Sequence, residues 1–87
     1  MNECKQKVTI NIDESKTIVE LSYLLQKYTS EIFILNETDG HVREINPKSI
    51  LGLATLQLHN NKEITVRAVG NDAERACQEV VNFFATN

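Results

Sequence analysis

The end of the chain carries a one-sided stripe of apolar residues, and this stripe restricts the possible folds more than any other feature. Its members recur at the spacing of one face of an α-helix: Ala73, Ala76, Cys77, Val80, Val81 and Phe84. Asn71, with Glu74 three residues later, fits a capping pair at the start of this helix. A helix that is apolar on one side has to pack that side against another layer, which the rest of the chain must supply.

The other layer is predicted to be a β-sheet, because apolar and polar residues alternate with a period of two in several places. Val8, Ile10 and Ile12 alternate in this way with polar neighbours, which is typical of a strand with one face in the core. The dipeptide Asp39-Gly40 is the strongest hairpin signal in the chain. Four strands are predicted, at residues 7–12, 32–35, 41–45 and 63–68.

A first helix is predicted between the first two strands. Thr17, with Glu20 three residues later, makes a candidate capping box, and Ser15 is a second candidate cap. The helix is expected to end near Tyr28. Its apolar stripe consists of Ile18, Leu21, Leu24, Leu25 and Tyr28.

A second, short helix is predicted after the single proline. Asn46 is a good cap and Pro47 suits the first helical position, so the helix should begin within residues 48–51. Ser49 then lies in its first turn, and Gly52 is expected to limit its length.

The element order is therefore β-α-β-β-α-β-α. We expect one α+β domain over residues 1–87, with a four-stranded antiparallel sheet covered on one face by three helices.

Charge and hydropathy exclude several classes of function. The chain has 9 Lys and Arg against 12 Asp and Glu, so it offers no basic stripe for nucleic acid. Its apolar runs fall far short of the roughly 18 residues that a membrane helix needs, and its polar beginning lacks a signal-peptide pattern. We expect a cytoplasmic protein that binds neither nucleic acid nor membrane.

The sequence also contains few candidate residues for a metal site, a cofactor site or a catalytic site. Cys4 and Cys77 lie far apart without metal-ligand spacing; one bridge is conceivable, but free thiols are expected in a cytoplasmic chain. His41 and His59 are interpreted as solvated loop residues, because neither has a ligand partner at a recognised spacing. We expect no metal, no cofactor and no enzymatic activity, since no nucleophile and base come together.

Ser49 is the one residue that suggests regulation. A phosphate on a serine in the first turn of a helix meets free N–H groups and the positive end of the dipole. On the residues alone, however, a simple capping role is the more economical interpretation. Ile50, Leu51 and Leu53 crowd the same short helix, so one or two of them are expected to be exposed for docking, with core packing for the rest.

The residues around Ser49 resemble the regulatory-serine signature of the HPr family, the small histidine-containing phosphocarrier proteins of the sugar phosphotransferase system. The sequence from Pro47 to Leu56 reads Pro-Lys-Ser-Ile-Leu-Gly-Leu-Ala-Thr-Leu. Residues 7–9, residues 63–66 and Gly70 also look like their family counterparts. The resemblance implies the family's open-faced β-sandwich and a bacterial, cytoplasmic protein.

The family's phosphocarrier site, His-X-Arg-Pro at the entry to the first helix, is degenerate in this sequence. The matching stretch is Glu14-Ser15-Lys16-Thr17, so Glu14 takes the place of the histidine and Lys16 that of the arginine. A carboxylate is no substitute for the nucleophilic imidazole, and lysine lacks the bidentate geometry of arginine. The hairpin 36–40 also looks longer than is usual for the family.

The resemblance further implies that Ser49 is the substrate of an HPr kinase/phosphorylase and that the seryl-phosphorylated form binds a catabolite control regulator. It assigns the docking of kinase, regulator and phosphotransferase-system proteins to Lys48, Ile50, Leu51 and Leu53. We therefore expect a non-catalytic regulatory or adaptor protein.

Three alternatives remain open at this point. The chain is a phosphocarrier with an unorthodox acceptor among His41, His59 and Glu14; or it is a scaffold reused for an unrelated partner; or Glu14 imitates the charge of a phosphohistidine.

Overall fold

The protein is described by a computed structural model that covers residues 2–12, 17–38, 40–55 and 60–85. The elements follow the predicted order: β1 (Glu3–Thr9), α1 (Ile18–Leu25), β2 (Glu31–Thr38), β3 (His41–Ile45), α2 (Ile50–Thr55), β4 (Glu63–Val69) and α3 (Ala73–Ala85).

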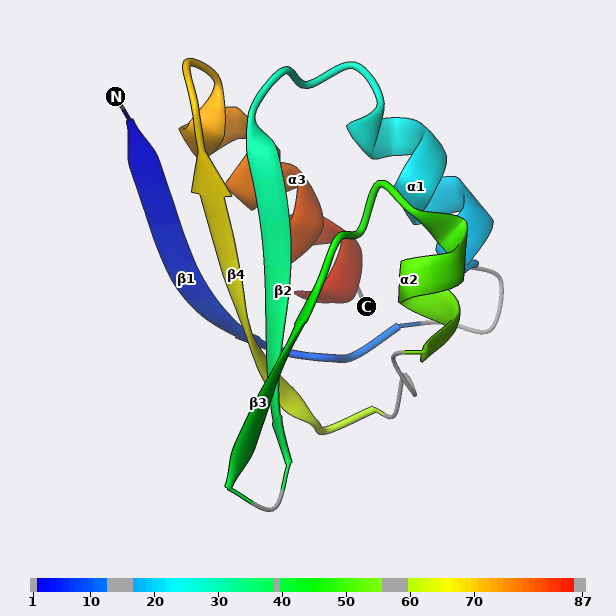
Figure 1. Ribbon diagram of the computed structural model, residues 1–87. Helices are drawn as coiled ribbons and strands as arrows, with labels where there is room; N and C mark the ends of the chain where they lie inside the picture. Colours follow the sequence, from blue (N-terminus) through cyan, green and yellow to red (C-terminus); the bar gives the residue numbers. More distant parts are fainter. Residues whose placement is uncertain (1, 13–16, 39, 56–59, 86–87) are drawn as a thin grey trace.

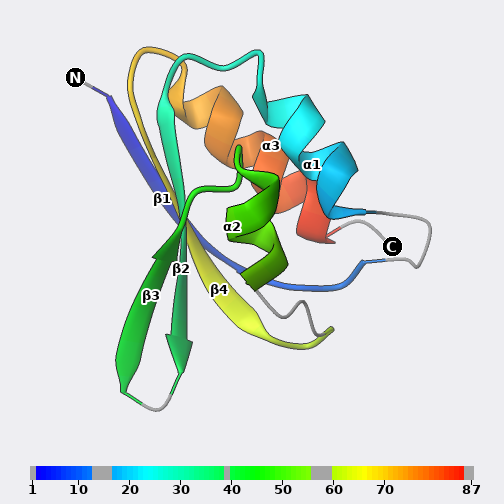
Figure 2. The same ribbon diagram turned by 45° about the vertical axis from the view of Figure 1, so that its right-hand side comes forward.

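The strands form one antiparallel sheet in the order β1-β4-β2-β3 (Figure 1). All three helices lie on the same side of this sheet, as the two views of the ribbon show (Figure 2). The predicted fold class is therefore confirmed.

The core fills the space between the sheet and the helices. Alternate residues of the central strands point into it, among them Ile34 of β2 and Val66 of β4, which are fully buried. The stripe predicted for α3 is buried except for Val81, which is half-buried, and Phe83 joins it.

Strand β1 occupies residues 3–9 and not the predicted 7–12. Its pairing with β4 runs from Glu3 opposite Val69 to Thr9 opposite Glu63, so the length of β4 sets the length of β1. Beyond Thr9, Ile10 still donates its N–H to the carbonyl of Lys62 at 2.8 Å and accepts from the N–H of Asn61 at 2.7 Å, and the N–H of Asn11 then donates to the carbonyl of Phe84 at 2.7 Å. Ile10 is fully buried and Ile12 packs against the core, which explains the alternation at residues 10–12.

Helix α1 ends at Leu25, three residues before the predicted end. The N–H of Tyr28 bonds to the carbonyl of Leu25 at 3.2 Å, in the tighter i to i−3 pattern that closes many helices. Tyr28 keeps an anchoring role, because its hydroxyl donates to Oε1 of Glu79 in α3 at 2.9 Å.

The hairpin between β2 and β3 is not the long loop that was predicted. Asn36 and Glu37 belong to β2, where they pair with Arg43 and Val42 of β3. Strand β2 runs to Thr38 and β3 begins at His41, on either side of the Asp-Gly signal in the sequence. The additional residues lengthen the two strands beyond Leu35, where the pairing of β2 with β4 ends.

Candidate functional site

Ser49 caps helix α2. Its Oγ accepts a hydrogen bond from the N–H of Gly52 at 3.2 Å, and its carbonyl accepts from the N–H of Leu53 at 2.9 Å. Since α2 begins at Ile50, Ser49 lies immediately before the first turn and not within it. The capping role is therefore confirmed, and the hydroxyl stays half-buried at the surface.

The residues before Ser49 form a turn and not the start of the helix. The side chain of Asn46 accepts from the N–H of Lys48 at 2.9 Å, and its carbonyl accepts from the N–H of Ser49 at 3.0 Å. Asn46 therefore caps this turn, and Pro47 lies within the turn. The hydrogen bond from the Lys48 N–H to the Asn46 side chain competes with helix formation, so the helix begins later. Asn46 is therefore not the cap of α2 and Pro47 is not its first residue, but the helix begins at Ile50, within the predicted residues 48–51.

Gly52 lies inside α2 and does not end the helix, which runs to Thr55. A Cβ at this position would lie 3.1 Å from the carbonyl oxygen of Asn46. The glycine therefore allows the helix to pack closely against the turn that precedes it.

The turn that presents Ser49 is tied to α1 and to the residues just after it by three hydrogen bonds. The carbonyl of Lys48 accepts from Oγ of Ser22 at 2.7 Å and from Nε2 of Gln26 at 3.0 Å. In return, Nζ of Lys48 donates to the carbonyl of Tyr28 at 2.5 Å. These bonds fix the position of Ser49 relative to α1, so the two helices form one platform.

Large apolar side chains are exposed on this platform. Leu51 of α2 is 82% exposed and Tyr23 of α1 is 78% exposed, while Val19 and Ile50 expose 56% and 46% of their surface. The two helices are neighbours in both views (Figures 1 and 2). We call Val19, Tyr23, Ile50 and Leu51 the helical patch.

Leu53 does not belong to the helical patch. Its side chain is fully buried in the core, so its prediction as a docking residue is wrong. Residues two positions apart lie about 200° apart around an α-helix, and this places Leu53 opposite Leu51.

The entry to α1 is described only from Thr17 onward, so Glu14, Ser15 and Lys16 lie outside the described residues. Thr17 is the cap of α1, and its Oγ1 accepts from the N–H of Glu20 at 3.1 Å. The predicted cap is therefore confirmed at Thr17.

The histidines contribute no site within the described part of the chain. His41 is exposed at the start of β3, opposite Thr38, and so belongs to a strand and not to the loop. His59 lies outside the described residues. Within the described ranges, no group of three His, Cys, Asp or Glu could hold a metal ion, and no helix is long and apolar enough to cross a membrane.

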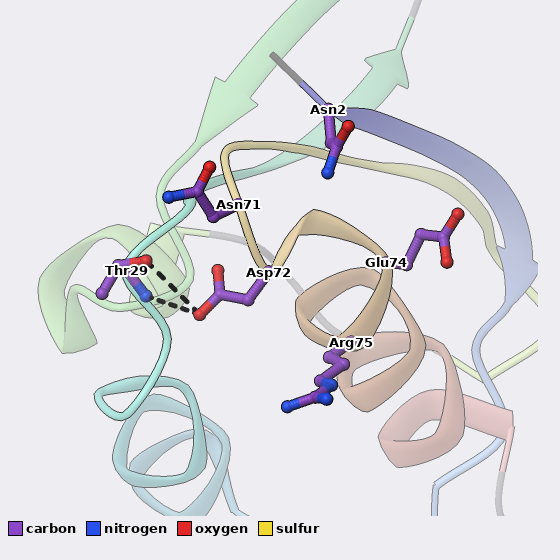
Figure 3. Close-up of a pocket in the computed structure, with 6 residues that line it drawn as sticks. All are labelled: Asn2, Thr29, Asn71, Asp72, Glu74 and Arg75. Atoms are coloured by element: carbon purple, nitrogen blue, oxygen red, sulfur yellow. Dashed lines mark hydrogen bonds between the residues drawn. The ribbon is translucent and has the colours of Figure 1, made fainter.

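A shallow pocket lies at the opposite end of α1, at the start of α3 (Figure 3). Asp72 is its central group, and its carboxylate accepts from the N–H groups of Thr29 and Ser30, both at 2.9 Å. The hydrogen bond from the Ser30 hydroxyl and that from the Thr29 N–H lower the pKa of Asp72 to about 2. Asp72, and not Asn71, precedes the first residue of α3, so the predicted pairing of Asn71 with Glu74 is wrong.

The Asp72 carboxylate is therefore committed to holding the loop after α1. The pocket is lined by Asn2, Thr29, Asn71, Asp72, Glu74 and Arg75. We interpret this pocket as part of the packing between the loop after α1 and the start of α3.

A polar contact also joins the residues just after α1 to α3. Glu79 of α3 pairs with Nζ of Lys27 at 3.2 Å, and its hydrogen bond raises the pKa of Lys27. Burial, followed by the hydrogen bond to Glu79, raises the pKa of Tyr28. No local pattern in the sequence indicates this contact, because Tyr28 and Glu79 are 51 positions apart.

The fold and the site define a class of small α+β proteins in which a helix-capping serine lies beside exposed apolar side chains of two helices. The family model PTS-HPr, described as the phosphorylation site of the HPr component of the phosphotransferase system, matches residues 4–86. The chain belongs to the HPr family.

The chain is similar to several HPr-like proteins. It is 40% identical to the HPr-like protein Crh of Halalkalibacterium halodurans over 57 residues, which span 66% of this chain and 63% of that relative. Its structure resembles the phosphocarrier protein HPr of Bacillus anthracis, with a TM-score of 0.79 at 24% identity, over 94% of this chain and 96% of that one. It also resembles Crh of Bacillus subtilis, with a TM-score of 0.66 at 25% identity, over 88% of this chain and 83% of that one. The protein is an HPr-like protein related to the phosphotransferase system.

Proposed function

We propose that this chain is a non-catalytic regulatory protein that binds its partners through the helical patch and is switched by phosphorylation of Ser49. The observation that carries the proposal is the position of Ser49, a half-buried residue at the start of α2, two residues before the highly exposed Leu51. The family resemblance assigns the regulatory phosphate to this serine. The proposed role is that of a cytoplasmic protein.

The surroundings of Ser49 suit a phosphate. The Oγ of Ser49 is held at the start of α2, where an added negative charge interacts favourably with the helix dipole. Because the turn is tied to α1, the phosphate would stand at a fixed place beside the helical patch. A partner could then recognise charge and apolar surface together.

The proposed partners are proteins: an HPr kinase/phosphorylase that modifies Ser49 and a catabolite control regulator that binds the modified form. The relative Crh of Bacillus subtilis is described as a catabolite repression protein, which supports this assignment. Phosphotransferase-system proteins are further candidates. Lys48, half-buried with its ammonium group on the carbonyl of Tyr28, stays a candidate contact at the rim.

The proposal is tested by the intact mass of the protein after incubation with ATP and an HPr kinase from the same organism. We expect one added phosphoryl group on the parent, mapped to the peptide that contains Ser49, and none on Ser49→Ala. An ordinary HPr serves as the positive control for the kinase. If the kinase modifies the control but not this chain, the switch is wrong and reuse of the scaffold for an unrelated partner is favoured.

The role of the helical patch needs a separate test. Leu51→Ser and Val42→Ser remove similar exposed side chains, but Val42 lies on β3, outside the patch, and is 64% exposed. We expect Leu51→Ser to weaken binding to the kinase at least about tenfold, the loss of about 1.4 kcal/mol, and Val42→Ser to leave it unchanged. Equal effects of the two substitutions would contradict docking through the patch.

A phosphocarrier with an unorthodox acceptor is the second candidate, and the match to a phosphocarrier family over residues 4–86 is the observation that favours it. The possible acceptors are His41, His59 and Glu14. Incubation with radiolabelled phosphoenolpyruvate and enzyme I would transfer label to such a carrier. A chain that stays unlabelled while an ordinary HPr is labelled eliminates this function.

A further inference from the structure

Cys4 points toward the helices from the edge strand β1. It pairs with Ala68 of β4, and residues directly opposite in an antiparallel pair share one face of the sheet. Ala68 is fully buried beneath the helices, and Cys4 packs against the same core cluster. The Cys4 side chain is therefore half-buried on the inner face of the sheet.

Cys77 lies on α3 and packs against the same face of the sheet. Its thiol is fully buried and donates to the carbonyl of Val66 at 3.8 Å, two residues before Ala68 on β4. Burial, followed by a hydrogen bond with the side chain of Cys4, raises the pKa of Cys77 to about 12. Helix α3 packs directly on both β1 and β4, so Cys4 and Cys77, at opposite ends of the sequence, lie on the facing surfaces of the sheet and α3.

We propose that Cys4 and Cys77 form an intramolecular disulfide when the protein meets a low-molecular-weight disulfide such as oxidised glutathione. Both thiols are free in the structure. The bond would join the edge strand β1 to α3. It lies outside the helical patch, so this inference does not depend on the regulatory role proposed above.

The reaction starts at Cys4, because it is the more accessible of the two thiols. The Cys4 thiolate attacks one glutathione sulfur, and the other glutathione leaves as a thiolate. Cys77 then loses its proton and attacks Sγ of Cys4, so that the second glutathione leaves. The chain loses two hydrogen atoms, and oxidised glutathione gains them as two thiols.

The bond would close a loop over most of the chain. A closed loop of this size restricts the unfolded chain strongly and so favours the folded state. At present β1 is held in the sheet by one neighbour only, β4. We therefore expect oxidation to stabilise the fold by fixing an edge strand to α3.

The experiment compares the folded protein in reduced and in oxidised glutathione. The product expected is a monomer lighter by two hydrogen atoms, with a Cys4–Cys77 linked peptide and a melting temperature more than about 10 °C higher. Cys77→Ala keeps a small apolar core residue and should stop at a glutathione adduct on Cys4. Cys4→Ser should form no intramolecular bond and show no shift in melting temperature.

Three results would overturn the proposal. The native parent protein could stop at the adduct on Cys4, or it could form only disulfide-linked dimers. It could also form the linked peptide only in urea, which would assign the bond to the unfolded chain. Each outcome is read from intact mass and peptide mapping of the same samples.

Discussion

The leucines of α2 offer the sharpest test of how the platform is built. Leu51 and Leu53 are identical side chains on one short helix, but Leu51 is 82% exposed and Leu53 is fully buried. Substitution by alanine removes the same side-chain atoms at both positions. Any difference in stability therefore reports the difference in burial alone.

The expected loss for Leu53→Ala is about 2 to 5 kcal/mol, since removing a buried leucine loses its transfer free energy and leaves a cavity. Against a total stability of roughly 4 to 13 kcal/mol for a chain of this length, that is a large fraction. The melting temperature should fall by at least roughly 10 °C. Leu51→Ala should change the stability by no more than about 0.5 kcal/mol.

Urea unfolding followed by circular dichroism measures both variants under the same conditions. The midpoint should fall clearly for Leu53→Ala and stay near that of the parent for Leu51→Ala. A loss for Leu51→Ala equal to that for Leu53→Ala would refute the assignment of the two faces of α2. It would also remove the basis for the helical patch.

Three further predictions concern the helix cap at Ser49, the close backbone approach at Gly70 and the pH dependence of the Asp72 hydrogen bonds. Ser49→Ala should cost about 1 kcal/mol and Ser49→Gly only a few tenths, measured by thermal unfolding; equal costs would contradict the cap. Gly70→Ala should destabilise by about 1 to 3 kcal/mol, because Gly70 has a φ of +146° and a Cβ would lie 2.5 Å from Oγ of Ser30; a neutral result in urea unfolding would rule out this close approach. The lowered pKa of Asp72 means that its contribution is complete above its ordinary value of 3.8 and is lost as the pH falls through about 2. The difference in melting temperature between the parent and Asp72→Asn should therefore shrink between pH 4 and pH 2, and a constant difference down to pH 2 would contradict the hydrogen-bonded carboxylate.

Much of the fold could be predicted because strand alternation and the α3 stripe each have one physical cause, the burial of one face. The ends of the elements were predicted less well. The polar residues at the start of β1 show no alternation, yet they pair because β4 extends alongside them. Asn36 and Glu37 are residue types that strands disfavour, but pairing with β3 overrides that preference.

The candidate site was predictable only in part. The sequence indicated Ser49 and the aliphatic residues that follow it, but it could not separate Leu51 from Leu53, because a short helix has too few residues to define its faces. Val19 and Tyr23 were missed. Their signal was present, since both are large apolar residues that lie off the apolar stripe of α1.

The polar contacts that join the residues after α1 to α3 could not be predicted at all. Asp72 reaches the loop after α1, and Glu79 reaches Tyr28, across separations of more than forty residues. Such pairs leave no local pattern, because they depend on how whole elements are placed.

The most direct test of the central claim is the dissociation constant for the catabolite control regulator of the same organism, before and after enzymatic phosphorylation of Ser49. Calorimetric titration with matched samples, and with Ser49→Ala carried through the same kinase treatment, supplies the comparison. The account predicts that phosphorylation strengthens binding at least about tenfold, a gain of about 1.4 kcal/mol, and that Ser49→Ala gains nothing. A dissociation constant that is unchanged by a phosphate on Ser49 would contradict it.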